Sequence, residues 1–596
     1  MSQYPVQEHV RKDEPTTGKA RKTCARALGG LAAAALFFPL GATLEASGPA
    51  SSPSARTVAL VASHRPAGSQ PSSRRLLLGG LEDPPEVRVG ERLFLETRFA
   101  EFFRRNFDGN VNHPLTSGDP AVAQLSTPAG PIPGPFAGKS MSCRNCHLVD
   151  DASGAPTSTY GDYARRSAVP ERGDGRTRTP RSSPPMVNAL LDRDGFVLHF
   201  DGQFATPEDL IRDTLTGRNF GWLPDETDLA IAHVARVIRE DDGTDDLAPQ
   251  YGNVSYRVLL AGTDPAIAPD SRIPAPYRVD VLRASDREVL DAVAALIAAY
   301  LRSLTFAQDG NGLYDGSPYD LFLARNGLPR SPAAGETAID YARRLRDAVE
   351  ALSAPAFVTG DDGGFEEHDQ EFAFGPGELR GLRIFLREPP TDPRVKAVRV
   401  GNCVKCHAPP HFTDFSLHNT GASQDEYDSI HGDGSFARLR VPDLATRAAR
   451  HEEFLPATRE HPNASGRFQA APAHRYPERA DLGAWNVFAN PDFPAPQPAL
   501  RSLLAALGDT PEAVLPRTIG LFKTPGLRDL GQSAPYLHTG RKREIEDVLD
   551  FYREIAAKAR QGKVRNASPE LSSITLGEDD VAPLAAFLRS LNEDYN

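Results

Sequence analysis

Two copies of one short motif constrain this chain more than any other feature of its 596 residues. The segments 143–147 (Cys-Arg-Asn-Cys-His) and 403–407 (Cys-Val-Lys-Cys-His) both have the pattern C-x-x-C-H. This pattern is typical of c-type haem attachment, in which two thiols bond the porphyrin vinyl groups and the following imidazole binds the iron. The sequence therefore predicts two covalently bound haem c groups. The residues expected to hold them are Cys143, Cys146 and His147 for haem 1, and Cys403, Cys406 and His407 for haem 2.

Disulfide bonds and a zinc ribbon are the alternative uses of these cysteines. A disulfide between Cys143 and Cys146 would close a small strained loop, and the histidine after each cysteine pair would then be a coincidence that occurs twice. A zinc ribbon also uses paired cysteines, but the two adjoining histidines favour haem. The fifth cysteine, Cys24, lies near the N-terminus and apart from both motifs.

The N-terminus has the layout of an export signal. Basic residues up to Arg26 precede the apolar run 28–40, and small residues follow it as far as Ala46. We therefore predict a signal peptide at 1–46, a disordered linker at 47–85, and a periplasmic or secreted protein. An uncleaved membrane anchor is the alternative. No later segment approaches the roughly 20 apolar residues of a bilayer span, so we expect no stable membrane span after signal cleavage.

An internal repeat indicates two similar haem domains. The octapeptide Ile-Ala-Ala-Tyr-Leu-Arg-Ser-Leu at 297–304 returns as Leu-Ala-Ala-Phe-Leu-Arg-Ser-Leu at 584–591. Both copies have helical apolar spacing and follow a haem motif, whereas the helical stretches 90–105 and 377–386 precede one. A helix before and a helix after the motif is the layout of a cytochrome c domain. We therefore predict a mainly α fold of two cytochrome c-like haem domains, with long loops and little β structure.

The repeat also sets the predicted domain boundaries. They are an N-terminal domain at 86–306 with a reactive haem 1, an inter-domain segment at 307–372, and a C-terminal domain at 373–596 with an electron-transfer haem 2 and an insertion at 421–500. The insertion includes the polar stretches 481–486 and 490–492. Long insertions in enzymes often shape substrate access.

A second repeat distinguishes the open faces of the two irons. Two stretches follow His199 and His538 and share their spacing when counted from Gly202 and Gly540. Twelve residues after these glycines, they carry Thr214 and Tyr552 respectively. A tyrosine phenolate can bind haem iron, and a threonine hydroxyl does not readily do so. No methionine follows Met186, so none is available to the second domain. Haem 1 is therefore predicted to be open, and haem 2 to be closed by Tyr552.

Two of these residues have a plainer structural interpretation. Tyr552 has the helical spacing of a core aromatic, and burial alone would explain it. His199 either lines the distal pocket of haem 1 or packs beside the haem, and we favour packing. No histidine lies between His147 and His199, so the intervening chain offers no other imidazole to cover haem 1.

The motif Gly-Asn-Cys-Val-Lys-Cys-His-Ala-Pro-Pro-His-Phe-Thr-Asp and its surroundings resemble the bacterial di-haem cytochrome c peroxidase and MauG family. The likeness covers most of 86–596 in islands, at 401–414, 417–421, 522–528, 534–540 and 548–552, and more weakly at 181–184 and 200–203. In the family, the position of Tyr552 carries methionine in the peroxidases and tyrosine in MauG-like enzymes. The resemblance therefore implies a MauG-like chain, with His538 among the residues that bind the cofactor.

The resemblance also implies residues between the two haems. The family holds a calcium ion there, and the matching positions are Ser182, Ser533 and the carbonyl of Pro535, although the family has asparagine in place of Ser182. The family's inter-haem tryptophan is matched by Phe200. Electron transfer would then use Phe200 or another aromatic, and the candidates are Trp222 and Trp485.

The haem 1 side departs from the family pattern. The family's distal glutamine and glutamate fall at Leu210 and near Phe220 respectively. Such polar groups normally move the proton that accompanies O–O cleavage, whereas an apolar pocket suits dioxygen or an apolar substrate, as in the related haem rubber oxygenases. The residues left as candidates for acid–base catalysis are His199, Asp201, Glu208 and Asp209.

These observations predict an oxidoreductase that uses hydrogen peroxide at haem 1, with haem 2 as an electron relay. A small redox protein or a protein substrate would be the electron donor. The alternatives are an oxygenase that cleaves an apolar substrate with O2, and a non-catalytic di-haem electron carrier. The net charge of −12 argues against nucleic acid as the main partner, because phosphate binding needs a basic surface.

Overall fold

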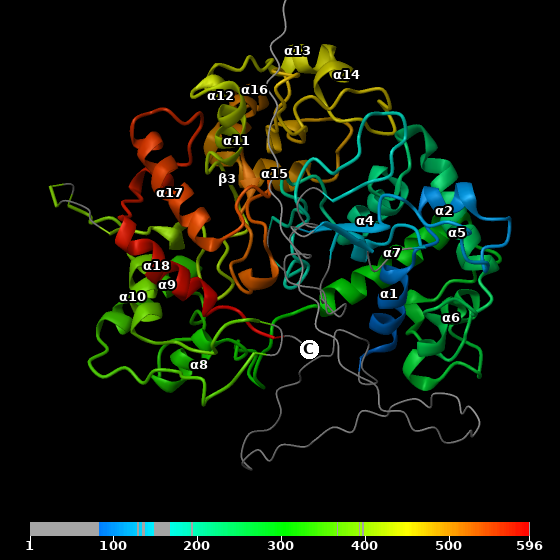
Figure 1. Ribbon diagram of the computed structural model, residues 1–596, viewed down its shortest axis with the longest axis horizontal. Coiled ribbons are helices and arrows are strands. Elements are labelled where there is room, and N and C mark those ends of the chain that lie inside the picture. The colour runs from blue at the N-terminus through cyan, green and yellow to red at the C-terminus, as the bar shows by residue number, and fades with distance from the viewer. Residues whose placement is uncertain are drawn as a thin grey trace, which may run out of the picture. The chain divides into compact units, whose positions relative to one another are not determined.

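The computed structural model describes residues 83–127, 130–133, 138–147, 167–191, 193, 195–365, 368–392, 394–395 and 399–594 (Figure 1). The predicted signal peptide, at 1–46, lies outside these residues, as does nearly all of the predicted linker at 47–85. Among the described residues, no helix has both the length and the apolar character that a membrane span requires.

Helices dominate the described residues, and this confirms the predicted mainly α fold. The α-helices are α1 (Pro85–Leu95), α2 (Glu101–Asn106), α4 (Pro207–Thr216), α5 (Thr227–Glu240), α6 (Tyr256–Ala261), α7 (Asp286–Ser303), α8 (Pro318–Arg325), α9 (Ala338–Glu350), α10 (Pro376–Leu386), α11 (Ala422–His431), α12 (Ser435–Arg438), α13 (Leu444–Ala449), α14 (His451–Phe454), α15 (Gln497–Leu503), α16 (Pro511–Val514), α17 (Ile545–Arg560) and α18 (Val581–Arg589). The β structure that the described residues contain is two short antiparallel pairs. Their strands are β1 (Gln124–Thr127) with β2 (Gly130–Pro133), and β3 (Leu417–His418) with β4 (Phe522–Lys523).

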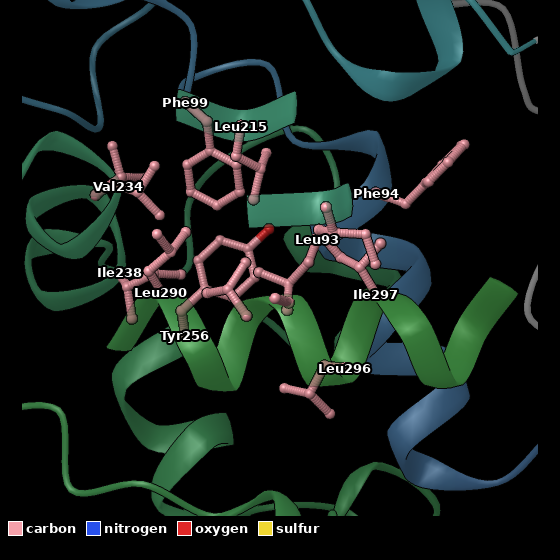
Figure 2. Packing of buried hydrophobic residues seen from close by; sticks show 14 of the residues in the cluster. Leu93, Phe94, Phe99, Leu215, Val234, Ile238, Tyr256, Leu290, Leu296 and Ile297 are labelled. Atoms are coloured by element: carbon pink, nitrogen blue, oxygen red, sulfur yellow. The ribbon is translucent and has the colours of Figure 1, made fainter. Parts of the chain in front are cut away.

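Helices α1 and α7 cross closely in the N-terminal half of the described chain (Figure 1). A Cβ atom placed on Gly90 of α1 would lie 2.1 Å from the carbonyl oxygen of Leu296 and 3.0 Å from the Cβ of Tyr300, both in α7. Only glycine allows this approach, because any side chain would collide with the α7 backbone. Figure 2 shows Leu93 of α1 beside Ile297 of α7 in the core that surrounds the crossing.

The same crossing recurs between α10 and α18 in the C-terminal half. A Cβ on Gly381 of α10 would lie 2.0 Å from the carbonyl oxygen of Pro583 and 2.7 Å from the Cβ of Phe587. In the octapeptide repeat, Phe587 occupies the position of Tyr300, and Pro583 precedes the repeat as Leu296 does. In both copies, the repeat therefore lies on the helix (α7 or α18) that packs against the glycine of an earlier helix (α1 or α10).

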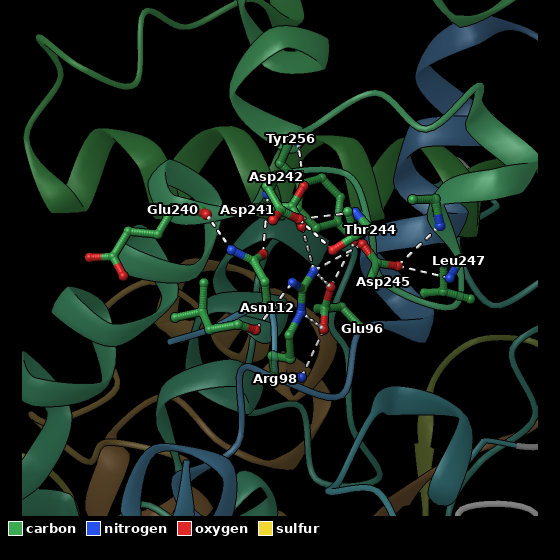
Figure 3. A network of polar contacts seen from close by, with 12 residues as sticks. Glu96, Arg98, Asn112, Glu240, Asp241, Asp242, Thr244, Asp245, Leu247 and Tyr256 are labelled. Atoms are coloured by element: carbon green, nitrogen blue, oxygen red, sulfur yellow. Dashed lines mark hydrogen bonds and ion pairs between the residues drawn. The ribbon is translucent and has the colours of Figure 1, made fainter. Parts of the chain in front are cut away.

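The predicted helix at 90–105 is wrong in one respect, because the structure has two helices, α1 and α2, with a break between them. Glu96 ends α1 in an extended conformation, and its carboxylate accepts hydrogen bonds from the backbone N–H and the Nε of Arg98, both at 2.8 Å. Arg98 also reaches Asp241 at 3.0 Å, and the Tyr256 hydroxyl donates to Glu96 at 3.0 Å (Figure 3). This buried network makes the break a fixed structural feature, because a buried carboxylate needs such partners.

The buried hydrophobic side chains of the described residues fall into separate clusters. One lies within residues 87–304 and a second within 319–591. Helices α8 and α9, from the segment predicted to lie between the domains, pack into the second cluster through Phe322 and Leu345. A third cluster is centred on the predicted insertion and contains Trp485. The insertion therefore shares a core with Val197 and with residues as far as Leu521.

The glycine crossing yields a stability prediction. We expect Gly381→Ala to lower the free energy of unfolding by about 1–3 kcal/mol, because the new methyl group meets backbone that cannot move aside. Gly377→Ala is the matched control, since nothing lies within 4 Å of a Cβ at that position of the same helix. It should be neutral or slightly stabilising. Urea unfolding of both variants checks this, and equal stabilities would contradict the close crossing.

Candidate functional site

Both C-x-x-C-H motifs fold into the same local structure. Each begins with a 3₁₀ turn, η1 (Cys143–Asn145) or η7 (Cys403–Lys405). In each, the histidine N–H donates to the carbonyl oxygen of the first cysteine, at 3.0 Å for His147 and 2.8 Å for His407. None of the four described cysteines forms a disulfide. Two thiols and an imidazole are thus presented side by side in each motif, as covalent haem attachment requires.

The two histidines are also oriented alike. Nδ1 of His147 lies 3.0 Å from the carbonyl oxygen of Pro184, and Nδ1 of His407 lies 3.0 Å from that of Phe412. A carbonyl accepts only, so Nδ1 carries the proton and Nε2 keeps its lone pair for a metal. Burial lowers the pKa of His147 to about 4 and also lowers that of His407. Both imidazoles are therefore neutral near pH 7 and suited to bind iron.

Each motif lines a cavity of its own. Cavity 1 is lined by Cys143, Cys146 and His147 together with residues of α4 and α7. Cavity 2 is lined by Cys403, Cys406 and His407 together with residues of α17 and α18. Each cavity thus joins the two thiols and the imidazole that hold one haem c, so the residues present fit one such group in each cavity.

Cavity 1 is lined largely by apolar side chains. They include Leu210, Ile211, Leu215, Phe220, Ile297 and Leu301. The positions where the family carries a distal glutamine and glutamate thus lie at this cavity and are apolar here. Thr214 also lines it, whereas the tyrosine at the corresponding point of the second repeat lines the other cavity. At this position of the repeat, cavity 1 therefore has the hydroxyl of a threonine and cavity 2 has that of a tyrosine.

His199 lines cavity 1 as well. Its Nδ1 lies 3.3 Å from Oε1 of Gln203, and the edge of the ring packs against Phe204 with centroids 4.8 Å apart. Burial lowers its pKa, so the ring is neutral near pH 7. Of the four residues named for acid–base catalysis, His199 is the one that the structure places at cavity 1.

The other three candidates lie away from both cavities. Glu208 pairs with Arg302 at 2.8 Å, and Asp209 pairs with Arg212 at 2.6 Å near the start of α4. Asp201 is fully buried, and its Oδ2 lies 2.6 Å from the guanidinium of Arg181. None of the three lines a cavity, and each carboxylate is held by an arginine. They act as ion-pair partners in this structure.

Tyr552 lines cavity 2 together with His407, His538 and both cysteines. It lies on α17, and burial raises the pKa of its hydroxyl. Its ring lies beside that of Phe551, with centroids 5.4 Å apart. His538 stacks on Phe522 with centroids 3.6 Å apart, and its Nε2 lies 3.2 Å from the Ser423 hydroxyl. Tyr552 therefore shares its cavity with the second motif, whereas the His538 ring is engaged in packing.

Phe200 lines both cavities and so belongs to the wall between them. Its ring centroid lies 6.2 Å from that of His538, which in turn stacks on Phe522. The carbonyl of Phe200 accepts a hydrogen bond of 2.7 Å from the N–H of Lys523, which also lines both cavities. Aromatic rings from both halves of the chain therefore meet between the two motifs.

The two tryptophans lie elsewhere. Trp222 is buried in the first core, with its ring 5.8 Å from that of His233. Trp485 is buried in the core of the insertion, where the guanidinium of Arg447 lies 4.9 Å from its ring centroid. Neither lines a cavity. The structure thus assigns both to core packing and leaves Phe200 as the predicted aromatic that lies between the motifs.

The three residues matched to the family's calcium site all line cavity 2. The Ser182 hydroxyl is buried without a hydrogen-bond partner among the described residues, whereas the Ser533 hydroxyl donates to the Asp529 carbonyl at 3.0 Å. With the carbonyl of Pro535, this set offers three neutral oxygens. Calcium takes six to eight oxygen ligands, usually with carboxylates among them. These residues alone do not fit a calcium ion.

The sequence interpretation missed a cationic side of cavity 1. Lys523 and Arg193 both line it. Burial, together with the charge of Arg193, lowers the pKa of Lys523 to about 7. The Arg193 guanidinium donates to the carbonyls of Leu191 and Val197. An anionic group that enters the cavity, such as a haem propionate, would be their natural partner.

A second missed feature is a hydrogen-bonded series that ends at cavity 1. Nδ2 of Asn188 donates to the Tyr314 hydroxyl at 2.9 Å, and that hydroxyl lies 2.8 Å from Nδ1 of His411. Asn188 and His411 both line the cavity. Burial lowers the pKa of His411 to about 4. His411 follows the second motif closely in sequence, so the sequence alone did not predict that it would line the first cavity.

Comparisons with known proteins give partial matches in sequence. No family model matches the chain. The cytochrome-c peroxidase IdrP2 of Denitromonas iodatirespirans is 26% identical over 192 residues, which is 32% of this chain and 36% of that protein. The methylamine utilization protein MauG of Methylorubrum extorquens is 36% identical over 74 residues, which is 12% of this chain and 19% of that protein.

The chain thus spans little more than a third of the length of the first of these relatives. Among solved structures, the diheme peroxidase BthA of Burkholderia thailandensis has a TM-score of 0.40 at 18% identity, over 86% of this chain and 87% of that one. The matches in sequence confirm that the chain resembles the di-haem cytochrome c peroxidase and MauG family.

Proposed function

We propose that this chain is a di-haem c-type oxidoreductase that uses hydrogen peroxide at cavity 1, with cavity 2 as the electron relay. The observation that carries the proposal is the pair of cavities, each lined by a C-x-x-C-H motif, with Phe200 in the wall between them. Peroxide is the oxidant because the relatives in sequence are named cytochrome-c peroxidases. A small redox protein or a protein substrate is the proposed electron donor, and export to the periplasm or beyond is part of the proposal.

The cysteines and histidines of the two motifs would hold the haems. When bound, each haem supplies an iron that exchanges electrons and, where one face is open, binds peroxide. His147 and His407 would bind the irons through Nε2, because their Nδ1 atoms are engaged with backbone carbonyls. Lys523 and Arg193 would neutralise propionate charge at cavity 1.

The difference between Thr214 and Tyr552 supports different tasks for the two cavities. Tyr552 would close the second site with an anionic oxygen ligand, which stabilises oxidised iron. At cavity 1 the corresponding residue is Thr214, and the apolar lining around it leaves room for a small oxidant. Phe200, His538 and Phe522 would provide the aromatic contacts across the wall.

His199 is the proposed acid–base group at cavity 1. Reduction of peroxide requires a proton to move between its two oxygens, and a neutral imidazole can accept and return one. Leu210 and Phe220 cannot perform this task, and the carboxylates of Asp201 and Glu208 are held in ion pairs.

The spin states of the two irons test the asymmetry. We expect electron spin resonance of the oxidised protein to show one high-spin and one low-spin signal. Tyr552→Phe should convert the low-spin signal to high spin, because it removes the second ligand. Tyr536→Phe is the matched control, since Tyr536 also lines cavity 2 but its hydroxyl donates to the Leu530 carbonyl. Haem staining of the denatured protein would establish covalent attachment in each variant.

Two low-spin signals in the unaltered protein would favour the electron carrier instead. In that case Met186, which lines cavity 1, is the first residue to test as an iron ligand. A low-spin signal that survives Tyr552→Phe would remove tyrosine as the ligand of haem 2.

Replacement of His199 tests its proposed acid–base role. We expect His199→Ala to lower kcat/KM for hydrogen peroxide about 100-fold or more, as is typical for loss of a general acid–base group. Because burial lowers the pKa of His199, the rate should hold from pH 8 to below 6.5 and then fall as the ring becomes protonated. The variant should lose this acid limb. His113→Ala is the control, since His113 is an exposed histidine paired with Asp108. An unchanged pH profile in His199→Ala would eliminate this role.

An oxygenase reaction is the second candidate function. The observation that favours it is the apolar lining of cavity 1, where Leu210 and Phe220 replace polar family residues. The two functions are separated by supplying either peroxide or O2 with an unsaturated apolar substrate and measuring which oxidant is consumed. Consumption of O2 alone would move the assignment to the oxygenase.

A further inference from the structure

A cluster of two histidines and an aspartate lies in the insertion, apart from both cavities. His451 begins α14, His461 lies in the loop that follows, and Asp492 belongs to the 490–492 stretch that the haem sites do not use. One nitrogen or oxygen atom from each of the three side chains lies within 4.8 Å of those of the other two. The cluster therefore brings together three segments of the insertion.

The distances within the cluster match those of metal ligands. Oδ2 of Asp492 lies 3.2 Å from Nε2 of His451 and 2.9 Å from Nδ1 of His461. In a tetrahedral zinc site with bonds of about 2.0–2.1 Å, neighbouring ligand atoms lie roughly 3.3–3.4 Å apart. The two imidazole rings are stacked with centroids 3.7 Å apart and planes 17° from parallel. A metal ion lies in the plane of each imidazole that binds it, so one ring would have to rotate out of this stack for all three atoms to share one ion.

Nε2 of His451 provides an independent observation. It is buried and lies close to the Asp492 carboxylate, but it makes no hydrogen bond to any described residue. The His451 side chain as a whole is 9% exposed. A buried polar atom without a partner is costly. A bound cation between Nε2 and the carboxylate would satisfy both groups.

The surroundings support the aspartate as a ligand. The Thr458 hydroxyl donates to Asp492 Oδ2 at 2.6 Å and accepts from the His461 N–H at 3.2 Å. Asp492 N–H donates to Oδ1 of Asn490 at 3.1 Å. Such contacts around a ligand fix its orientation. The nearby positive charge of Arg447 acts against a cation, but its guanidinium donates to the carbonyls of Trp485, Phe488 and Ala489.

We propose that His451, His461 and Asp492 bind one divalent transition-metal ion, zinc in the first instance. Two imidazoles and one carboxylate suit zinc, whereas calcium and magnesium prefer oxygen ligands alone. Solvent would supply the fourth ligand, since the His461 side chain is 34% exposed and gives access to the site. The ion would tie α14 to the loops at 458–461 and 490–492 and so stabilise the insertion.

The test uses the full haem-loaded protein. The protein is stripped of loosely held metal with a chelator, dialysed, and titrated with zinc while bound zinc is counted by mass spectrometry. We expect one zinc per chain and a higher unfolding temperature when zinc is bound. Asp492→Asn and His461→Ala should each weaken binding by more than about 10-fold, because even residues that only support a ligand have effects of this size.

His113→Ala is the matched control, since His113 and Asp108 form a histidine–aspartate pair with Nδ1 and Oδ2 2.7 Å apart and no third ligand. It should leave zinc binding unchanged. The haem absorption spectrum verifies that each variant is folded, and His461→Ala decides the test if Asp492→Asn does not fold. Absence of tight zinc binding in the unaltered protein, or equal binding in His461→Ala, would overturn the proposal.

Discussion

A hydrogen bond from each motif histidine to a backbone carbonyl is the contact on which the proposed haem chemistry depends. It fixes the tautomer and presents Nε2 to the cavity, so the orientation of each iron ligand is set by the path of the main chain. For His147 the acceptor is Pro184, and Pro184 lines both cavities. Any displacement of this segment would therefore change the orientation of His147 and the wall of cavity 2 together.

Other contacts hold the same wall in place. The N–H of Ser182 donates to the His538 carbonyl at 2.9 Å, and the N–H of Lys523 donates to the Phe200 carbonyl at 2.7 Å. Beside them, Arg181 joins Asp201 to Asp481. Burial would raise the pKa of Asp481, but the guanidinium of Arg181 outweighs this and holds it below the usual value. Main-chain bonds and a buried ion pair thus set the spacing between the proposed haems.

The sequence predicts features that are encoded locally. The two motifs and the octapeptide repeat could be recognised because the spacing of their residues reflects the attachment chemistry and the helical period. The break at Glu96 could not, because it depends on Asp241 and Tyr256, which are distant in sequence. The same limit applies to the cavity residues. Phe200 was indicated by the resemblance, whereas Lys523 offered no local sign that it would line both cavities.

The placement of Trp485 has the same cause. An aromatic residue in a polar stretch can serve electron transfer or packing, and only its neighbours distinguish the two. In the structure it packs against Phe468 and under Arg447, within the core of the insertion.

The insertion is connected to the haem region through Asp481, which comes four residues before Trp485 in the same stretch. Its Oδ1 and Oδ2 lie 2.8 and 2.6 Å from the guanidinium of Arg181. Arg181 also binds Asp201, the residue that follows Phe200 in the inter-haem wall. The insertion therefore supplies one of the two carboxylates that neutralise a buried arginine, and removal of either partner of such a pair is strongly destabilising. The core that it shares with Val197 and its link to Arg181 make it a structural support of the wall between the proposed haems.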